Sequence, residues 1–431
     1  MNLKKQLSVF ILGIAVLLGA QSFAHGRDLD RSQTMTLSGE DVVLRWNRVL
    51  IETLQTPGQQ PSTIVAGRSL AMVHAAIFDA VNSIDGSYKP YLTDVPGSKN
   101  ASIEAAAAKA ARDVLASLYP SRTAIFDAEF ASSITGLEEY RVQQGIRVGE
   151  IVAQRIIEAR TNDGWTADRP AFVLSADPGN WQPTPPANAA AALTHFPNVI
   201  PFALKNGTQF MPPPPPALTS AAYATALNEV KELGAVNSAT RTADQTQQAQ
   251  AWASVGNPTA APIVWNKIAG TLAVSQGNTT VENARMFALL NISHHDAFQT
   301  TFASKYNYGL WRPVTAIRRA DEDGNADTEA EAGWSSLITT PPYPTYAGNM
   351  ATIGWSNAAM LALFFGRDDL PVQYTFPTGA TRSYMSLSSV AEEMGRSRIY
   401  GGIHFEFDSD AGRSIGTNTS NHIYLNFLTA R

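Results

Sequence analysis

Apolar residues recur at the spacing of an α-helix along most of this chain. They fall three and four residues apart from Asp41 to Gln55, where Thr56-Pro57-Gly58 ends the pattern, and again from Arg68 to Asn82. The same spacing predicts further helices over residues 101–118, 121–134, 138–160, 220–234, 241–254, 262–276, 279–303 and 350–365. Alternation typical of β-strands is scarce throughout. The sequence therefore predicts an all-α protein.

Residues 165–218 interrupt the helical pattern with many prolines. Proline breaks helices, and the run 212–216 favours polyproline II. A segment this long without regular structure is usually a covering or functional loop. Its aromatic residues indicate that it packs on the helices: Trp165, Phe172, Trp181, Phe196, Phe202 and Phe210. We expect it to cover part of a functional site and to shape substrate access; a flexible interdomain linker is the alternative.

Two helices in different parts of the chain share a pattern. The motif Arg-x2-Ala-x7-Asp-Ala occurs at residues 68–80 and again at 285–297. Such a repeat indicates two related helical bundles, with chance similarity between alanine-rich helices as the alternative. We therefore expect an N-terminal helical half (25–164), a proline-rich covering segment (165–218) and a C-terminal helical half (219–431).

Residues 1–24 have the pattern of a secretory signal peptide. Lys4 and Lys5 precede the apolar run Leu7–Ala20, and Ser22-Phe23-Ala24 has the small-x-small pattern of a cleavage site. The run is too short to favour a membrane span, and no later stretch reaches eighteen apolar residues without a charge. The sequence therefore predicts a secreted or periplasmic protein with no membrane span in the mature chain.

The charge and the cysteine count exclude some functions. The formal charge is −5, and it becomes −7 once the two lysines of the leader are removed. An acidic chain argues against a nucleic-acid surface. Cysteine is absent, which excludes disulfides and thiolate chemistry.

The candidate chemistry lies in two blocks of the C-terminal half. Lys305 is followed after six residues by Arg312-Pro313, and Ser397-Arg398 is followed by His404 and then Asp408. Arginine forks and a lysine point charge suit the oxygens of a tetrahedral oxyanion. His404 supplies a neutral nitrogen that can attack or coordinate the central atom, and Asp408 can fix its tautomer. Surface charge plus a core histidine is the alternative interpretation.

The pattern Lys-x6-Arg-Pro followed by Ser-Arg-x5-His-x3-Asp resembles the signature of the vanadium-dependent haloperoxidases. These enzymes share that signature with the phosphatidic acid phosphatase type 2 superfamily. The resemblance implies two related helical bundles and a vanadate bound covalently through His404, its metal ligand. Lys305, Arg312 and Arg398 would neutralise the vanadate oxygens, and Lys305 would polarise bound peroxide. Hydrogen peroxide and halide would be the substrates.

The family has a third element between these blocks, a Pro-Ser-Gly-His loop that opens a helix. Aligned without gaps, its serine, glycine and histidine fall on Gly348, Asn349 and Met350. In the family this histidine is the general acid/base, and a thioether cannot transfer protons. A helix start still offers backbone N–H groups and a positive dipole end, so we expect Gly348 and Asn349 to contact the anion. Alternatively, Asn349 only caps the helix.

Other polar residues near the signature are weaker candidates. Asp296 lies where family members often carry an aspartate, so it is a candidate counter-ion, with a helix cap or a surface role as the alternative. His294, His295 and His422 are the candidates for replacing the missing acid/base group, with surface or structural roles as the alternative.

Three functions remain open at this point. The first is a haloperoxidase-like enzyme, weakened by Met350, with vanadate as its cofactor. The second is a secreted phosphomonoesterase that needs no cofactor and uses His404 as nucleophile. The third is an oxyanion-binding protein without turnover. Halide preference, organic substrate and oligomeric state do not follow from the sequence, and a homo-oligomer is compatible with it.

Overall fold

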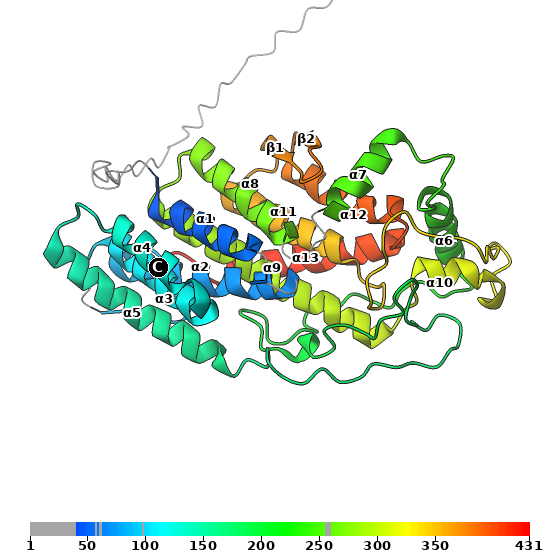
Figure 1. Cartoon of the computed structure of the whole chain (residues 1–431), viewed down its shortest axis with the longest axis horizontal. Helices are drawn as coiled ribbons and strands as arrows, with labels where there is room; N and C mark the ends of the chain where they lie inside the picture. The colour runs from blue at the N-terminus through cyan, green and yellow to red at the C-terminus, as the bar shows by residue number, and fades with distance from the viewer. Residues whose placement is uncertain (1–39, 57, 60–62, 97–98, 255–259) are drawn as a thin grey trace, which may run out of the picture. The chain divides into compact units, whose positions relative to one another are not determined.

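The computed structural model describes residues 40–56, 58–59, 63–96, 99–254 and 260–431. The described chain is mainly α-helical, which confirms the predicted all-α class (Figure 1). The predicted signal peptide lies outside the described residues. Among the helices that are described, none is both long and apolar enough to cross a membrane.

The N-terminal helices form within a few residues of the predicted ranges. They are α1 (Val42–Gln55), α2 (Thr63–Asp85), α3 (Ile103–Leu118), the short 3-10 turn η2 (Pro120–Arg122), α4 (Thr123–Ser133) and α5 (Glu139–Thr161). Helix α3 packs along both α2 and α5. Asp41 and Ser102 cap α1 and α3 by accepting backbone N–H groups of the first turn.

The second set of helices begins after the proline-rich segment. It comprises α6 (Ala221–Leu233), α7 (Ala243–Ser254), α8 (Ala260–Gln276), α9 (Thr280–Tyr308), α10 (Pro313–Arg318), the 3-10 turn η4 (Ala320–Glu322), α11 (Asn349–Phe365), α12 (Leu387–Tyr400) and α13 (Glu406–Asn426). Helix α11 packs against α9, α12 and α13. Helix α9 continues past its predicted end to Gly309, whose left-handed conformation terminates it.

Some elements were not predicted. Helices α12 and α13 are rich in serine, glycine and charged residues, which weakens the apolar pattern that reveals a helix. A hairpin of β1 (Val372–Thr375) and β2 (Thr381–Tyr384) pairs antiparallel, with Val372 opposite Tyr384. Its four-residue strands are too short to show a clear alternation.

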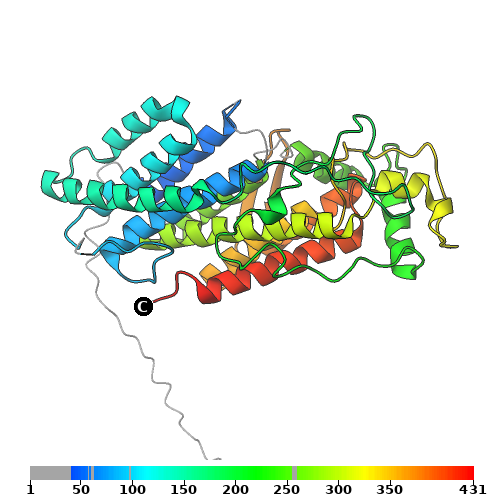
Figure 2. The same ribbon diagram turned by 90° about the horizontal axis from the view of Figure 1, so that it is seen from below.

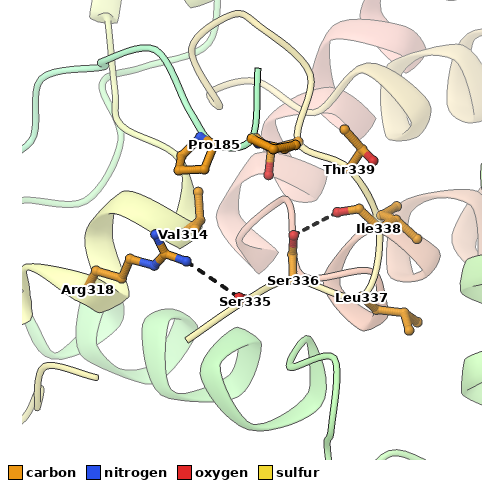
Figure 3. A pocket seen from close by; sticks show the side chains of 10 residues that line it. Pro185, Val314, Arg318, Ser335, Ser336, Leu337, Ile338 and Thr339 are labelled. Atoms are coloured by element: carbon orange, nitrogen blue, oxygen red, sulfur yellow. Dashed lines mark hydrogen bonds between the residues drawn. The ribbon is translucent and has the colours of Figure 1, made fainter. Parts of the chain in front are cut away.

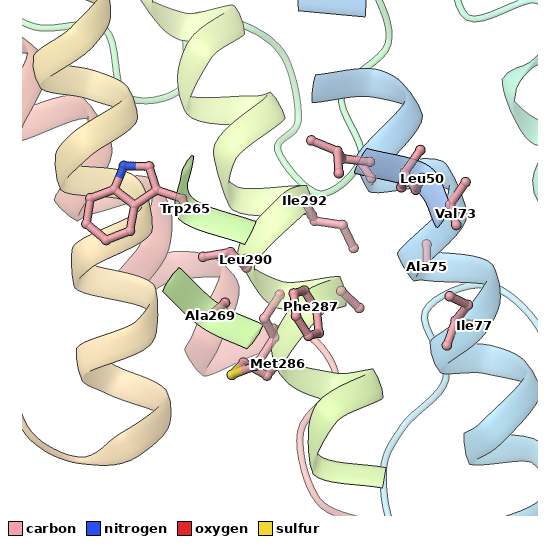
Figure 4. Packing of buried hydrophobic residues seen from close by; sticks show 14 of the residues in the cluster. Leu50, Val73, Ala75, Ile77, Trp265, Ala269, Met286, Phe287, Leu290 and Ile292 are labelled. Atoms are coloured by element: carbon pink, nitrogen blue, oxygen red, sulfur yellow. The ribbon is translucent and has the colours of Figure 1, made fainter. Parts of the chain in front are cut away.

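One apolar core runs through both sets of helices. In Figure 4, Phe287 and Ile292 of α9 lie between Trp265 of α8 on one side and Leu50 of α1 and Val73 of α2 on the other, all in one cluster. A second cluster, which includes Tyr223, Trp311, Phe405 and Ile415, lies in the C-terminal part. Burying this much apolar surface is the main stabilising contribution to such a fold.

The repeated motif has a structural counterpart. Asp79 of α2 accepts the consecutive N–H groups of Tyr91, Leu92 and Thr93, and Asp296 of α9 accepts those of residues 202–204. Each carboxylate therefore holds a loop against its helix. Asp296 is fully buried, so the alternative of a surface role was wrong.

Residues 165–218 contain no α-helix, only the 3-10 turn η3 (Phe196–Asn198). The segment runs alongside α9 in space (Figure 2). Trp181 and Phe196 are buried, and the hydroxyl groups of Tyr308 and Tyr346 donate to the carbonyls of Pro212 and Pro213. This segment therefore packs on the helices that carry the signature residues.

Candidate oxyanion site

The signature residues come together from several elements. Lys305 lies in the last turn of α9, Arg312 is the residue before α10, Arg398 lies on α12, and Asp408 lies in the first turn of α13. His404 lies in the turn that joins α12 to α13. All of these side chains are buried. The two blocks, far apart in sequence, meet where Arg312 Nη1 lies 3.2 Å from His404 Nε2.

The imidazole is held in one orientation. His404 Nδ1 lies 2.8 Å from Asp408 Oδ2 and 3.1 Å from the Thr345 hydroxyl. Asp408 Oδ2 also accepts the Phe405 N–H and the Thr345 hydroxyl. This arrangement places the proton on Nδ1 and leaves the Nε2 lone pair facing Arg312. His404 precedes α13, so Asp408 reaches back over the helix start instead of pairing along one helical face.

The electrostatics keep this histidine neutral. Burial lowers the pKa of His404 well below its ordinary value, and Arg312, Lys305 and Arg398 lower it further. Burial raises the pKa of Asp408, while the Thr345 hydroxyl and the Lys305 charge oppose that rise. At neutral pH, His404 Nε2 is therefore an unprotonated nitrogen surrounded by cations.

Each of the two arginines has a guanidinium N–H group that donates to no protein acceptor in the described part of the chain. Arg312 Nε donates to the Tyr343 carbonyl and Nη1 to the Ile403 carbonyl, at 2.7 and 2.8 Å. Arg312 Nη2 and Arg398 Nη1 are buried without a hydrogen-bond partner among the described residues. Burial lowers the pKa of each guanidinium to about 10, so both stay charged at neutral pH. An unpaired buried donor is costly, and an acceptor anion would remove that cost.

Lys305 behaves differently from its prediction. Its Nζ donates to the carbonyls of Pro344, Thr345 and Ala347, at 3.1, 2.7 and 2.6 Å. An ammonium has three N–H donors, so these bonds use all of them. Burial, followed by the Arg312 charge, lowers the pKa of Lys305 well below its ordinary value. Lys305 thus holds the 344–347 loop and offers the site its charge rather than a free donor.

The start of α11 also departs from expectation. The Gly348 N–H, predicted to contact the anion, donates to the Asp408 carbonyl at 2.8 Å because α13 crosses close to it. Gly348 occupies the N-cap position without a side-chain cap bond, so Asn349 does not cap the helix. The Asn349 amide instead donates to the Tyr343 hydroxyl at 3.0 Å. Met350 is partly buried against the apolar core.

Tyr343 belongs to the site although the signature does not contain it. Its ring centre lies 5.0 Å from the Arg312 guanidinium carbon and 5.2 Å from Lys305 Nζ, within range for cation–π attraction. Tyr343 and Met350 are only partly buried, unlike the cations. The signal that could have revealed it is its place between Pro342 and Pro344 at the start of the altered loop.

None of the histidines proposed as a replacement acid/base contacts the site. His294 bonds with Asn357, His295 with Asp296, and His422 lies beside Gln209. His294 and His295 are buried, so a surface role is excluded for both. Burial lowers the pKa of His294 to about 3, which keeps it neutral. These contacts are structural.

A hollow of about 280 Å³ lies beside α10 (Figure 3). It is lined by Pro185 and Pro186 of the covering segment, Val314 and Arg318 of α10, and residues 335–340. Arg318 Nε donates to the Trp334 carbonyl at 2.8 Å, so this charge is tied to the wall of the hollow. Helix α10 therefore has the arginine of the site at one end and the hollow on its side.

The sequence comparisons find relatives of part of this chain. Residues 285–429 match the family model of the second helical-bundle domain of vanadium chloroperoxidase. The vanadium chloroperoxidase of Curvularia inaequalis is 26% identical over 243 residues, which cover 42% of this chain and 39% of that enzyme. The matched region thus spans well under half of the curated relative.

The fold matches over most of the chain. A bacterial vanadium-dependent iodoperoxidase has a TM-score of 0.76 and 24% identity, with 90% of this chain and 95% of that one covered. A bacterial vanadium-dependent chloroperoxidase has a TM-score of 0.67 in both its apo and holo forms, at 15% and 16% identity. The apo and holo comparisons cover 85% and 87% of this chain, and 94% of the other chain in each case. Residues 285–429 are therefore similar to the second helical-bundle domain of vanadium chloroperoxidase, and the chain shares the helical fold of bacterial vanadium haloperoxidases.

Proposed function

We propose that this protein is a vanadium-dependent haloperoxidase-like enzyme that oxidises halide with hydrogen peroxide. The observation that carries the proposal is the pair of unpartnered buried guanidinium nitrogens, on Arg312 and Arg398, beside the neutral Nε2 of His404. A tetrahedral oxyanion such as vanadate matches these donors in charge and in hydrogen-bonding type. When bound, vanadate would activate hydrogen peroxide for transfer of an oxygen to halide.

Each residue has a distinct role in this proposal. His404 would hold the central atom through Nε2, while Asp408 and Thr345 keep the imidazole in the required tautomer. Arg312 and Arg398 would neutralise the anion oxygens. Lys305 would contribute its charge and fix the loop that carries Tyr343, because its donors already bond to loop carbonyls.

In this proposal, Met350 lowers the rate of turnover. The family's acid/base histidine would deprotonate the incoming peroxide, and a thioether cannot do so. Turnover is therefore expected to be lower than with a histidine at this position.

The same geometry favours one second function, phosphomonoester hydrolysis. A neutral imidazole with a fixed tautomer, surrounded by cations, can also attack phosphorus. An oxyanion-binding protein without turnover is the limiting case in which Met350 removes catalysis altogether. Residues 1–24 support a secreted or periplasmic location for each of these functions.

The test starts with binding and ends with turnover. Protein incubated with orthovanadate and then desalted is expected to retain vanadium and to brominate in the presence of hydrogen peroxide. Retained vanadium without bromination, together with cleavage of aryl phosphates, would favour the phosphatase. Failure to bind either vanadate or phosphate in calorimetry would refute every function that rests on this site.

A further inference from the structure

Most proton-carrying groups of the site are already engaged within the protein, including the Thr345 hydroxyl, which donates to Asp408. Arginine does not give up its proton at accessible pH, and the three Lys305 donors are engaged by carbonyls. Asp408 and the Nδ1 side of His404 bond with each other behind the imidazole. Met350 carries no proton to transfer. Tyr343 remains.

The hydrogen bonds of Tyr343 direct its proton. Its oxygen accepts the Asn349 amide, so its own hydrogen points elsewhere. Arg312, Lys305 and Arg398 are donors only and cannot accept that hydrogen. No acceptor for the Tyr343 O–H occurs among the hydrogen bonds of the residues that the structure describes. An anion bound between the two guanidinium groups would supply the missing acceptor.

The groups around Tyr343 would also stabilise the tyrosinate that forms when its hydroxyl releases a proton. Arg312 and Arg398 lower the pKa of Tyr343, as does the Asn349 amide, while burial acts in the opposite direction and dominates. The phenol therefore stays protonated at rest and has cations beside it when its proton leaves. Tyr343 is also only partly buried, unlike the cations around it.

We propose that the Tyr343 hydroxyl is the proton donor to the leaving oxygen at this site, taking over the task that Met350 cannot perform. The inference rests on the proposed function and adds a residue to it. With a phosphomonoester as probe, His404 Nε2 forms the new bond to phosphorus and the ester P–O bond breaks. Its electron pair stays on the leaving oxygen, which takes the Tyr343 proton. The water that completes hydrolysis then returns a proton to the tyrosinate.

Kinetics of paired variants test the assignment. Tyr343→Phe is expected to slow hydrolysis of alkyl phosphates by about 10²–10⁴-fold and that of activated aryl phosphates much less, because a good leaving group needs no proton. Adding Met350→His to Tyr343→Phe is expected to restore most of the loss. Tyr308→Phe, which removes a hydroxyl bonded to Pro212 in the covering segment, is the matched control and is expected to behave like the wild type.

A spectroscopic measurement reads the same contact without turnover. Alkaline titration of the tyrosinate absorbance, taken as wild type minus Tyr343→Phe, reports the ionisation of Tyr343 alone. Saturating inorganic phosphate is expected to raise that pKa, because the bound anion accepts the O–H and repels the tyrosinate.

The outcomes separate this inference from the proposed function. If the wild type binds neither phosphate nor vanadate, both fail. If it binds phosphate but the Tyr343 titration does not move, the hydroxyl does not face the anion, and only the inference fails. Equal loss on alkyl and aryl phosphates, or no rescue by Met350→His, would likewise reduce Tyr343 to a structural role.

Discussion

The helices α1–α5 and α6–α13, called here the N-terminal and C-terminal bundles, contain the same kind of close helix crossing, but only the second set carries the candidate site. In the N-terminal bundle, Gly145 of α5 crosses the start of α3 so closely that a Cβ would lie 2.5 Å from the Ser102 carbonyl oxygen. In the C-terminal bundle, Gly412 of α13 crosses the start of α11, and a Cβ would lie 2.7 Å from the Gly348 carbonyl oxygen. One turn further on, Gly149 and Gly416 make the same kind of approach.

The hydrogen bonds at the two junctions also correspond. The Ser102 N–H donates to the Arg141 carbonyl at 2.9 Å, and the Gly348 N–H donates to the Asp408 carbonyl at 2.8 Å. By this correspondence Arg141 takes the place of Asp408. An exposed arginine cannot hold an imidazole tautomer, so this junction lacks the partner that positions His404.

The helix starts show the remaining difference. The Ser102 hydroxyl accepts the Ala105 N–H and donates to Glu104, which satisfies the start of α3 locally. Gly348 has no side chain to do this, and its N–H donates to the Asp408 carbonyl of α13. The comparison teaches that a close helix crossing alone does not make a site, because the polar side chains that meet at the C-terminal crossing have no counterparts among the described residues at the N-terminal one.

The largest effect on turnover is expected from substitutions at the second residue of α11 and of α3. Met350→His adds an acid/base group at the start of α11 and is expected to speed bromination by up to about 10²–10⁴-fold at saturating vanadate. Glu104→His makes the corresponding change in α3 and is expected to have no effect on turnover. No gain from Met350→His over wild type would contradict the explanation of weak activity.

The next effect concerns anion affinity. Arg398→Ala removes a guanidinium with a free buried donor, so affinity for inorganic phosphate is expected to fall by about 10–100-fold in calorimetry. Arg141→Ala in the other bundle should leave affinity unchanged. Similar losses from both variants would mean that overall charge, not the site, attracts the anion.

The glycine junctions predict matched losses of stability. Gly145→Ala and Gly412→Ala each push a Cβ within 3 Å of backbone atoms, so each is expected to lower the free energy of unfolding by about 1–3 kcal/mol in urea denaturation. Only Gly412→Ala should also weaken phosphate binding, because it displaces Gly348. If Gly145→Ala weakens binding equally, the two junctions are not independent.

Each bundle contains a buried histidine that should make the free energy of unfolding depend on pH. Burial lowers the pKa of His74 on α2 and of His294 on α9 to about 3, below the ordinary 6.5. Between these values the unfolded chain binds the proton and the folded chain does not, so stability falls as pH decreases from about 6.5 towards 3. Each histidine contributes a slope of up to about 1.4 kcal/mol per pH unit.

Single replacements by glutamine measure this slope. His74→Gln and His294→Gln are each expected to flatten the pH dependence of the unfolding free energy over that range. An unchanged slope in one variant would show that its histidine titrates freely in the folded state.

The sequence alone predicted most of the helices, the resemblance to the vanadium haloperoxidases and a set of polar side chains that the fold brings together. Periodicity located most helices because one face of each is buried, and the spacing of Arg312, Arg398, His404 and Asp408 identified groups that do meet. Aromatic residues in 165–218 correctly indicated packing on the helices. These features depend on residue type and local order along the chain.

Only the tertiary structure decided which donors are free. The path of the 344–347 loop brings carbonyls onto Lys305, and the crossing of α13 uses the Gly348 N–H, although both were expected to contact the anion. The same loop places Tyr343 among the cations. Whether a donor serves a ligand or the protein depends on contacts between segments distant in sequence, and spacing along the chain carries no information about them.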